Sequence, residues 1–183
     1  MLSHGESDAY IQIPNAQAGG GGIPLQRICV PVDSYGQADP ALVQAARLSA
    51  VIGGQLRLVH VRMWDPVPRS VGARFYMETS EQATEVLYQA LTRVWACGAS
   101  ASGVVVDAPR NRVARVIAAA ARSWGAEIMV ISRRRRTAIG VLLRGSVSAQ
   151  LMREAGCPVL VTRQRRSSQP GTPGIEASRS AEP

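Results

Sequence analysis

Four short apolar runs of this chain end in residues that could contact a small ligand: Asp33, Val61, Asp107 and Ser132. A carboxylate that closes a buried strand can accept hydrogen bonds from the ribose or the base of a nucleotide, which makes Asp33 the first candidate. The alternative is that the Asp33 side chain only caps the turn at residues 34–36.

A second candidate site is the pair Gly145-Ser146, which directly precedes a predicted helix. Glycine lets the backbone approach a ligand closely, and the serine hydroxyl together with the unpaired amides of the first helical turn can bind an anion. The alternative is that Ser146 only caps the helix, an interaction worth about 1 kcal/mol.

Every basic residue is an arginine, and the net charge is +8. Residues 26–163 hold eighteen arginines against nine acidic residues, so the positive charge lies in this part of the chain. Arg133 to Arg136 and Arg144 share one predicted loop, where guanidinium groups could bind the phosphates of a nucleotide, a nucleic acid or polyphosphate. A solvated loop is the alternative, and codon bias is an alternative cause of the arginine usage. No aromatic residue interrupts the run, which disfavours a base-stacking platform for single strands.

The residue types disfavour an enzyme. His4 and His60 are the only histidines, no triad can be assembled around them, and His60 is expected to be a packed side chain of a strand. Cys29, Cys97 and Cys157 match no metal-ligand spacing, which predicts reduced and mostly buried thiols. We therefore expect no catalytic residue and no metal ligand, with slow ATP hydrolysis left open.

The elements that must position these residues alternate between strands and helices. Strands are predicted at residues 27–33, 55–61, 102–107, 127–132 and 157–162, and helices at residues 40–52, 79–96, 111–124 and 146–154. Caps support the helix ends: Asp39 precedes Pro40, Gln82 can complete a capping box on Thr79, and Gly125 follows the third helix. Right-handed crossovers then give an open parallel sheet between two layers of helices, with any ligand at the carboxyl ends of the strands.

One domain is predicted over residues 26–163, between disordered tails at residues 1–25 and 164–183. No apolar stretch approaches the roughly 20 residues that a membrane-spanning helix requires. The first residues lack the basic start and apolar middle of a secretory signal, so we expect a cytoplasmic protein.

The succession RICVPVDS, LRLVHV, WGAEIMVIS and VLLRGSVSAQLMREAGCPVLVTR resembles the universal stress protein family over residues 26–163. The resemblance implies a single-domain α/β fold of the nucleotide-binding α-hydrolase type. Its sheet would have five parallel strands in the order 3-2-1-4-5 and helices on both faces. Proteins of this family often form dimers, which we expect here through the last strand, Pro158 to Thr162. The implied function is a regulatory stress response without catalysis.

The resemblance also implies an adenine nucleotide site, with ATP bound in the branch that carries Gly-x2-Gly-x9-Gly-Ser. The contacts that it implies are to adenine from Asp33 and Val61, to ribose from Pro31, and to phosphate from Gly145, Ser146 and the amide of Val147. Counting back from Gly145, Ser132 and Arg135 replace the first two glycines of the pattern. Arginine at 135 costs about 1 kcal/mol if the glycine conformation is kept, but it brings a guanidinium group to the phosphates. The alternatives are an arginine-loop binder of nucleic acid or polyphosphate, and a dimeric scaffold that binds no nucleotide.

Overall fold

A computed structural model of the chain describes residues 11–13, 26–33, 40–133 and 146–163. The predicted C-terminal tail, residues 164–183, lies outside the described residues, as do residues 34–39 and 134–145. Only part of the predicted N-terminal tail is described, and that part forms a strand.

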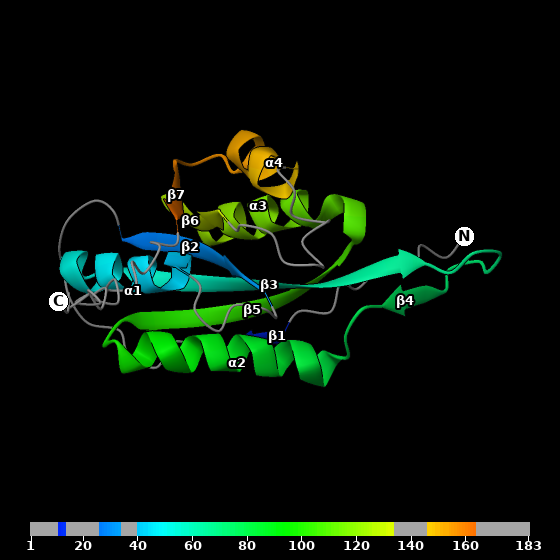
Figure 1. Cartoon of the computed structure of the whole chain (residues 1–183), viewed down its shortest axis with the longest axis horizontal. Helices are drawn as coiled ribbons and strands as arrows, with labels where there is room; N and C mark the ends of the chain where they lie inside the picture. Colours follow the sequence, from blue (N-terminus) through cyan, green and yellow to red (C-terminus); the bar gives the residue numbers. More distant parts are fainter. Residues whose placement is uncertain (1–10, 14–25, 34–39, 134–145, 164–183) are drawn as a thin grey trace, which may run out of the picture.

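The described residues form one twisted, mostly parallel sheet with helices on both faces (Figure 1). Its strands are β1 (Ile11–Ile13), β2 (Arg27–Val32), β3 (Gln55–Pro66), β4 (Arg74–Tyr76), β5 (Ser100–Pro109), β6 (Ile128–Arg133) and β7 (Val159–Arg163). The helices are α1 (Pro40–Ile52), α2 (Ser80–Ala96), α3 (Val113–Trp124), which follows a 3₁₀ turn at Arg110–Arg112, and α4 (Ser146–Glu154).

The parallel part of the sheet has the strand order β5-β3-β2-β6-β7. This is the predicted order 3-2-1-4-5, so the α/β class and the order of these five strands are confirmed. The strand count is corrected, because β1 pairs antiparallel with β5 and β4 pairs antiparallel with β3. The prediction of an N-terminal tail without structure is wrong for Ile11–Ile13, whose backbone pairs with Gly103 to Val105.

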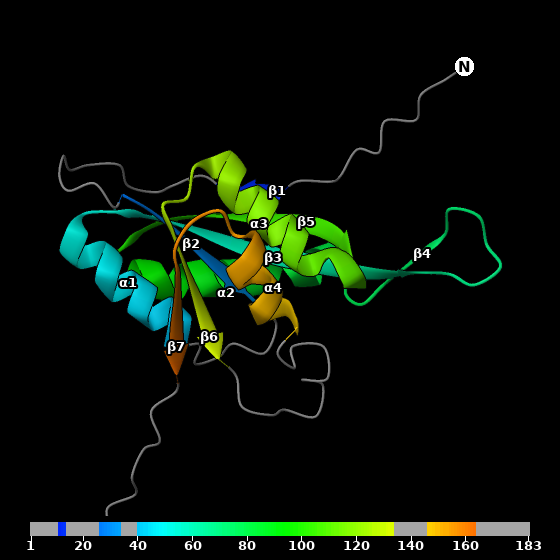
Figure 2. The same ribbon diagram turned by 90° about the horizontal axis from the view of Figure 1, so that it is seen from above.

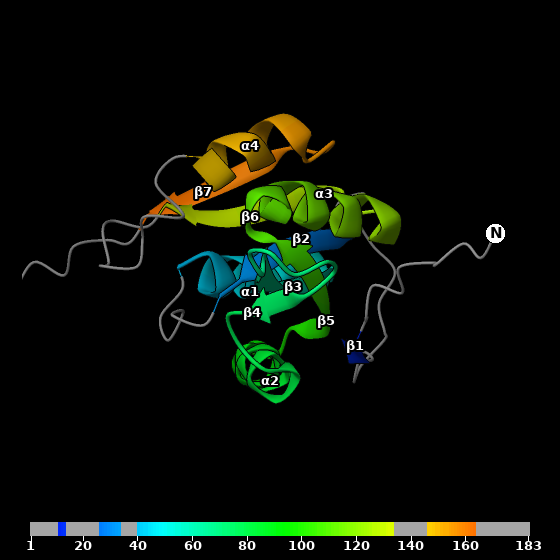
Figure 3. The same cartoon turned by 90° about the vertical axis from the view of Figure 1, so that its right-hand side faces the viewer.

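Two hydrophobic clusters fill the space between the sheet and its helices. On one face, α1 and α2 pack on alternate residues of the strands, such as Ile28, Leu56 and Leu58. On the other face, α3 and α4 cover the residues in between, such as Cys29, Val59 and Val61 (Figure 3). Successive side chains of a strand point to opposite faces of the sheet, so neighbouring residues of β3 can belong to different clusters.

The helix ends follow the predicted cap chemistry. Thr79 accepts a hydrogen bond from the amide of Gln82, and the Gln82 side chain accepts one from the amide of Thr79, so the capping box on α2 is confirmed. Gly53 and Gly125 adopt left-handed conformations, with φ of 67° and 74°, at the ends of α1 and α3. The predicted cap Asp39 lies outside the described residues.

The predicted end of the second strand at residue 61 is wrong, because β3 continues to Pro66 and the chain turns back as β4. The resulting hairpin projects from the body of the domain (Figure 2). Arg74 lies over the ring of Trp64, with 4.5 Å between the guanidinium carbon and the ring centroid. Beside the hairpin, Arg110 forms an ion pair with Asp65 at 2.9 Å.

Candidate functional site

The sheet order brings several predicted site residues to one edge. Pro31 is in β2 and Asp33 directly follows it, Val61 is in β3, and Ser132 is near the end of β6. β2 pairs with β3 on one side, as far as Val32 with His60, and with β6 on the other, so the end of β2 lies next to the middle of β3, where Val61 follows His60, and on the β6 side of the sheet. Pro31, Asp33 and Ser132 are half-buried, so each is partly accessible to solvent.

The amino end of α4 lies on the same side of the sheet as Val61. Val147, the second residue of α4, is 9% exposed and belongs to the same hydrophobic cluster as Val61 and Ile131. Ser146 begins the helix, as predicted. Gly145 and Arg135 lie outside the described residues, together with Arg134, Arg136 and Arg144, and nothing is described of the Arg133 side chain.

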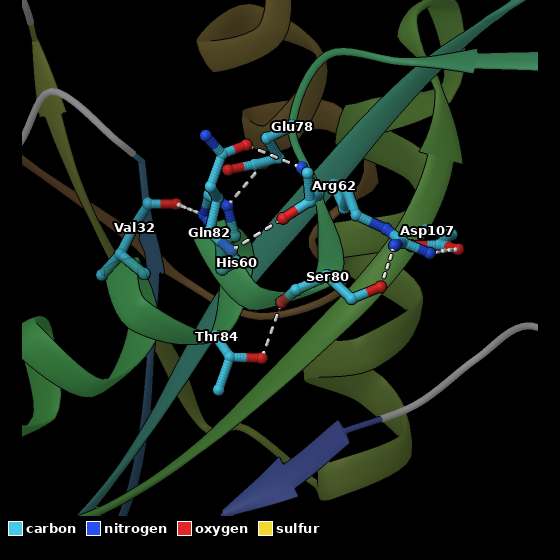
Figure 4. A network of polar contacts seen from close by, with 9 residues as sticks. Val32, His60, Arg62, Glu78, Ser80, Gln82, Thr84 and Asp107 are labelled. Carbon is cyan, nitrogen blue, oxygen red and sulfur yellow. Dashed lines mark hydrogen bonds and ion pairs between the residues drawn. The ribbon is translucent and has the colours of Figure 1, made fainter.

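Asp107, the other carboxylate near a strand end, is bound by an arginine of the neighbouring strand β3. Its two oxygens accept hydrogen bonds from Arg62 Nε at 2.7 Å and from Arg62 Nη2 at 2.6 Å (Figure 4). Arg62 also donates to Ser80 Oγ, and its guanidinium carbon lies 4.2 Å from the centroid of the Tyr76 ring. The hydrogen bonds from Arg62 to Asp107 raise the pKa of Arg62 above its usual value. Asp107 is therefore a buried partner of an arginine.

His60 is the functional candidate that sequence reasoning treated as a plain packed residue. The structure buries it to 2% exposure, and both of its ring nitrogens lie near oxygens. Nδ1 is 3.1 Å from the carbonyl oxygen of Val32, and Nε2 is 2.8 Å from Glu78 Oε1 (Figure 4). The signal in the sequence was a histidine inside an apolar strand, but nothing local pointed to Glu78, which is 18 residues away.

The cysteines are all free, and only one of them is fully buried. Burial, with a smaller effect from nearby Cys157, raises the pKa of Cys29 to about 12. Cys157 is half-buried and Cys97 is exposed, so the prediction of mostly buried thiols is wrong for Cys97. Among the described residues there is no group of three His, Cys, Asp or Glu side chains that could hold a metal ion. The described helices also include none that is long and apolar enough to span a bilayer.

Comparison with known proteins gives one consistent result. A family model described as "Universal stress protein family" matches residues 24–163. A universal stress protein of Mycolicibacterium smegmatis is 33% identical over 141 residues, 73% of this chain and 47% of that protein, so the chain spans about half of its length. A universal stress protein of Thermus aquaticus, encoded in the QAH/OAS sulfhydrylase 3' region, is 30% identical over 142 residues, 76% of this chain and 99% of that protein.

Solved structures agree in fold. A protein of the universal stress protein family from Burkholderia pseudomallei has a TM-score of 0.56 and 27% identity, covering 75% of this chain and 96% of that one. The universal stress protein from Archaeoglobus fulgidus in complex with dAMP has a TM-score of 0.52 and 22% identity, covering 74% and 96%. A universal stress protein in complex with cAMP has a TM-score of 0.52 and 20% identity, covering 76% and 97%.

Proposed function

This chain belongs to the universal stress protein family, and on that premise we propose that it is a regulatory domain that binds an adenine nucleotide at the carboxyl ends of β2 and β6. The observation that carries the proposal is the position of Asp33 and of the α4 amino end at this edge. β2 is the strand from which the chain continues to β3 on one side, while β6 and β7 are added on the other. Ligands of open α/β sheets bind at such a switch point.

The residues at this edge suit the parts of a nucleotide. Asp33 is half-buried after β2, where its carboxylate can accept hydrogen bonds from an adenine amine or from a ribose. Pro31 and Val61 offer backbone and apolar contacts beside it. The first turn of α4 supplies unpaired amides, among them that of Val147, for a phosphate. In this assignment Ser132 and Arg135 stand at the two replaced glycines of the phosphate loop.

The nucleotide complexes of structural relatives support the same ligand class. The two relatives described above that hold dAMP and cAMP share this fold. Their common chemistry is adenine with one phosphate, so we propose adenine nucleotides as the ligand class, with ATP as one member of it.

We propose binding without turnover. His60 and Asp107, two of the acid-base candidates near this edge, are engaged in the fold, and the carboxylate of Asp33 is assigned here to the nucleoside. His60 makes two hydrogen bonds, and Asp107 is paired with Arg62. A general base must be free to reach the proton that it takes. We further propose that the protein is cytoplasmic and forms a homodimer through β7, where Leu160 is 43% and Val161 is 39% exposed at the end of the sheet.

Mass spectrometry of the gently purified full chain tests the ligand. We expect an adenine nucleotide to co-purify with the wild type and to be absent from Asp33→Ala. Nucleic acid or polyphosphate that co-purifies equally with both proteins would favour binding by the arginine loop. If no anion co-purifies and none binds when it is added back, a scaffold without a ligand is the better account.

A further inference from the structure

His60 connects two segments that meet at the carboxyl edge of the sheet. One is the end of β2, through the carbonyl oxygen of Val32, which is the register partner of His60 across the β2–β3 ladder. The other is the segment that enters α2, through the carboxylate of Glu78, which directly precedes the helix cap Thr79. Both hydrogen bonds lie in the interior, since the side chains of His60 and Glu78 are 3% and 14% exposed.

The two partners of the ring are both acceptors. A carbonyl oxygen and a carboxylate oxygen have no hydrogen to give, and a neutral imidazole carries only one N–H. A neutral ring would therefore point a nitrogen lone pair at one of the two oxygens. That nitrogen and that oxygen would be buried without a hydrogen bond between them, which costs free energy. Both hydrogen bonds need an N–H on each ring nitrogen. The pair must therefore hold one proton more than a neutral imidazole beside a carboxylate, as an imidazolium beside a carboxylate does.

One other cation lies near the pair: Arg62 interacts electrostatically with Glu78, although its hydrogen bonds go to Asp107. On β3 and β5, Arg62 and Asp107 neutralise each other in their own ion pair. Asp33 follows β2 and Glu81 lies in the first turn of α2, and both are acidic. Arg62 is held by Asp107 at 2.6 Å, and the carboxylate that contacts the His60 ring is that of Glu78, at 2.8 Å.

The peptide group that His60 holds is the one that begins Asp33. The Val32 carbonyl and the Asp33 amide belong to the same planar unit, so a hydrogen bond to that carbonyl fixes the direction in which the chain leaves β2. We propose that protonated His60 is a positioning residue of the nucleotide site: it orients Asp33 through the Val32 carbonyl and makes nucleotide affinity dependent on pH. This inference rests on the nucleotide site proposed above, and it deepens that proposal.

The variant Glu78→Gln keeps the contact between His60 and residue 78 but no longer requires the His60 ring to be protonated. The amide of a glutamine can donate to Nε2, so a neutral ring with its hydrogen on Nδ1 can then make both bonds. The variant should keep the hydrogen bonds of His60 to Val32 and to residue 78 at every pH. The wild type should lose one of its two hydrogen bonds as the ring deprotonates. His60→Leu removes both bonds and serves as the null variant, while Glu78→Gln guards against a result that reflects misfolding alone.

The first measurement is nitrogen-15 NMR of the full chain between pH 5.5 and 8.5, without any nucleotide. We expect both ring nitrogens of wild-type His60 to be protonated at the acidic end, and the Asp33 amide shift to follow the ring as pH rises. In Glu78→Gln the ring should be neutral throughout, and the Asp33 amide should not move with it. A neutral wild-type ring over the whole range, or an Asp33 amide indifferent to it, would overturn the inference.

The second measurement is calorimetric titration of both proteins with AMP over the same range. The affinity of the wild type relative to Glu78→Gln should fall by about three- to tenfold from the acidic to the basic end, the loss expected for one hydrogen bond. Protonation of the AMP phosphate affects both proteins equally and cancels in this ratio. A constant ratio would overturn the inference. If neither protein binds AMP, the proposed function fails, and the NMR result alone decides whether His60 positions Asp33.

Discussion

Single residues at the carboxyl edge show what a linear sequence can and cannot predict. Asp33 and Asp107 were singled out for the same reason, since each ends an apolar run, yet only Asp33 stands at the switch point of the sheet. Asp107 is instead held by Arg62, which is 45 residues away in sequence. A partner at that separation is set by the register of β3 against β5, and no local pattern reveals it.

The Arg62–Asp107 pair gives the first prediction. The two side chains are 13% and 6% exposed, so Asp107→Asn leaves a largely buried guanidinium without a counter-charge. Removal of one partner of a buried ion pair costs about 3 kcal/mol of unfolding free energy or more. We expect a loss of that size in urea denaturation.

The neighbouring Asp65–Arg110 pair is the matched control. Its side chains are 41% and 34% exposed, and water screens pairs of that kind. Asp65→Asn should therefore change stability by less than about 1 kcal/mol. Equal losses in the two variants would show that burial does not decide the strength of these pairs.

At the scale of elements, the apolar period and the cap residues were enough to predict α1 to α4 and the five parallel strands. The three-residue strands β1 and β4 were missed because they have no period of their own and exist only through their partners. The end of β3 was missed for a related reason. Arg62 and Asp65 break the apolar alternation of the strand, and the ion pairs that allow them there are tertiary contacts.

The packing of α2 on the sheet gives the second prediction. A Cβ atom added at Gly103, in β5, would lie 2.8 Å from a Leu87 side-chain carbon of α2. Contacts that close do not persist, so Gly103→Ala must displace the helix or the leucine, at a cost of about 1 to 3 kcal/mol. Urea denaturation of the variant measures this cost.

The same substitution in a Leu87→Ala background is the control. The smaller side chain leaves room for the added methyl group, so the cost of Gly103→Ala should shrink there. An unchanged cost in the double-mutant cycle would mean that the glycine is needed for a reason other than this contact.

At the scale of the whole molecule, the two ends of the sheet differ. β1 pairs with the outer edge of β5, whereas in the described part of the chain β7 pairs with β6 alone. An open edge strand with exposed apolar side chains tends to pair with another strand. We expect a homodimer through β7, which Leu160→Arg should dissociate into the 19.5 kDa monomer in sedimentation.

Val43 of α1 provides the comparison for that experiment. It is 42% exposed, against 43% for Leu160, but it lies on a helix. Val43→Arg should leave the dimer intact. A wild type that sediments only as a monomer at micromolar concentration, or a dimer that survives Leu160→Arg, would contradict an interface at β7.

Calorimetric titration of the full chain with ATP and with inorganic polyphosphate, for the wild type and for Asp33→Ala, tests the proposed nucleotide site most directly. We predict that the wild type binds ATP and that Asp33→Ala abolishes this binding while leaving any polyphosphate binding unchanged. The reason is that, in the proposed site, the Asp33 carboxylate contacts the nucleoside, and polyphosphate has no nucleoside. ATP affinity should also fall as salt is added, because salt screens exposed charges and the Debye length is only about 8 Å at physiological ionic strength. Strong polyphosphate binding that ignores Asp33, with no ATP binding by the wild type, would contradict the account.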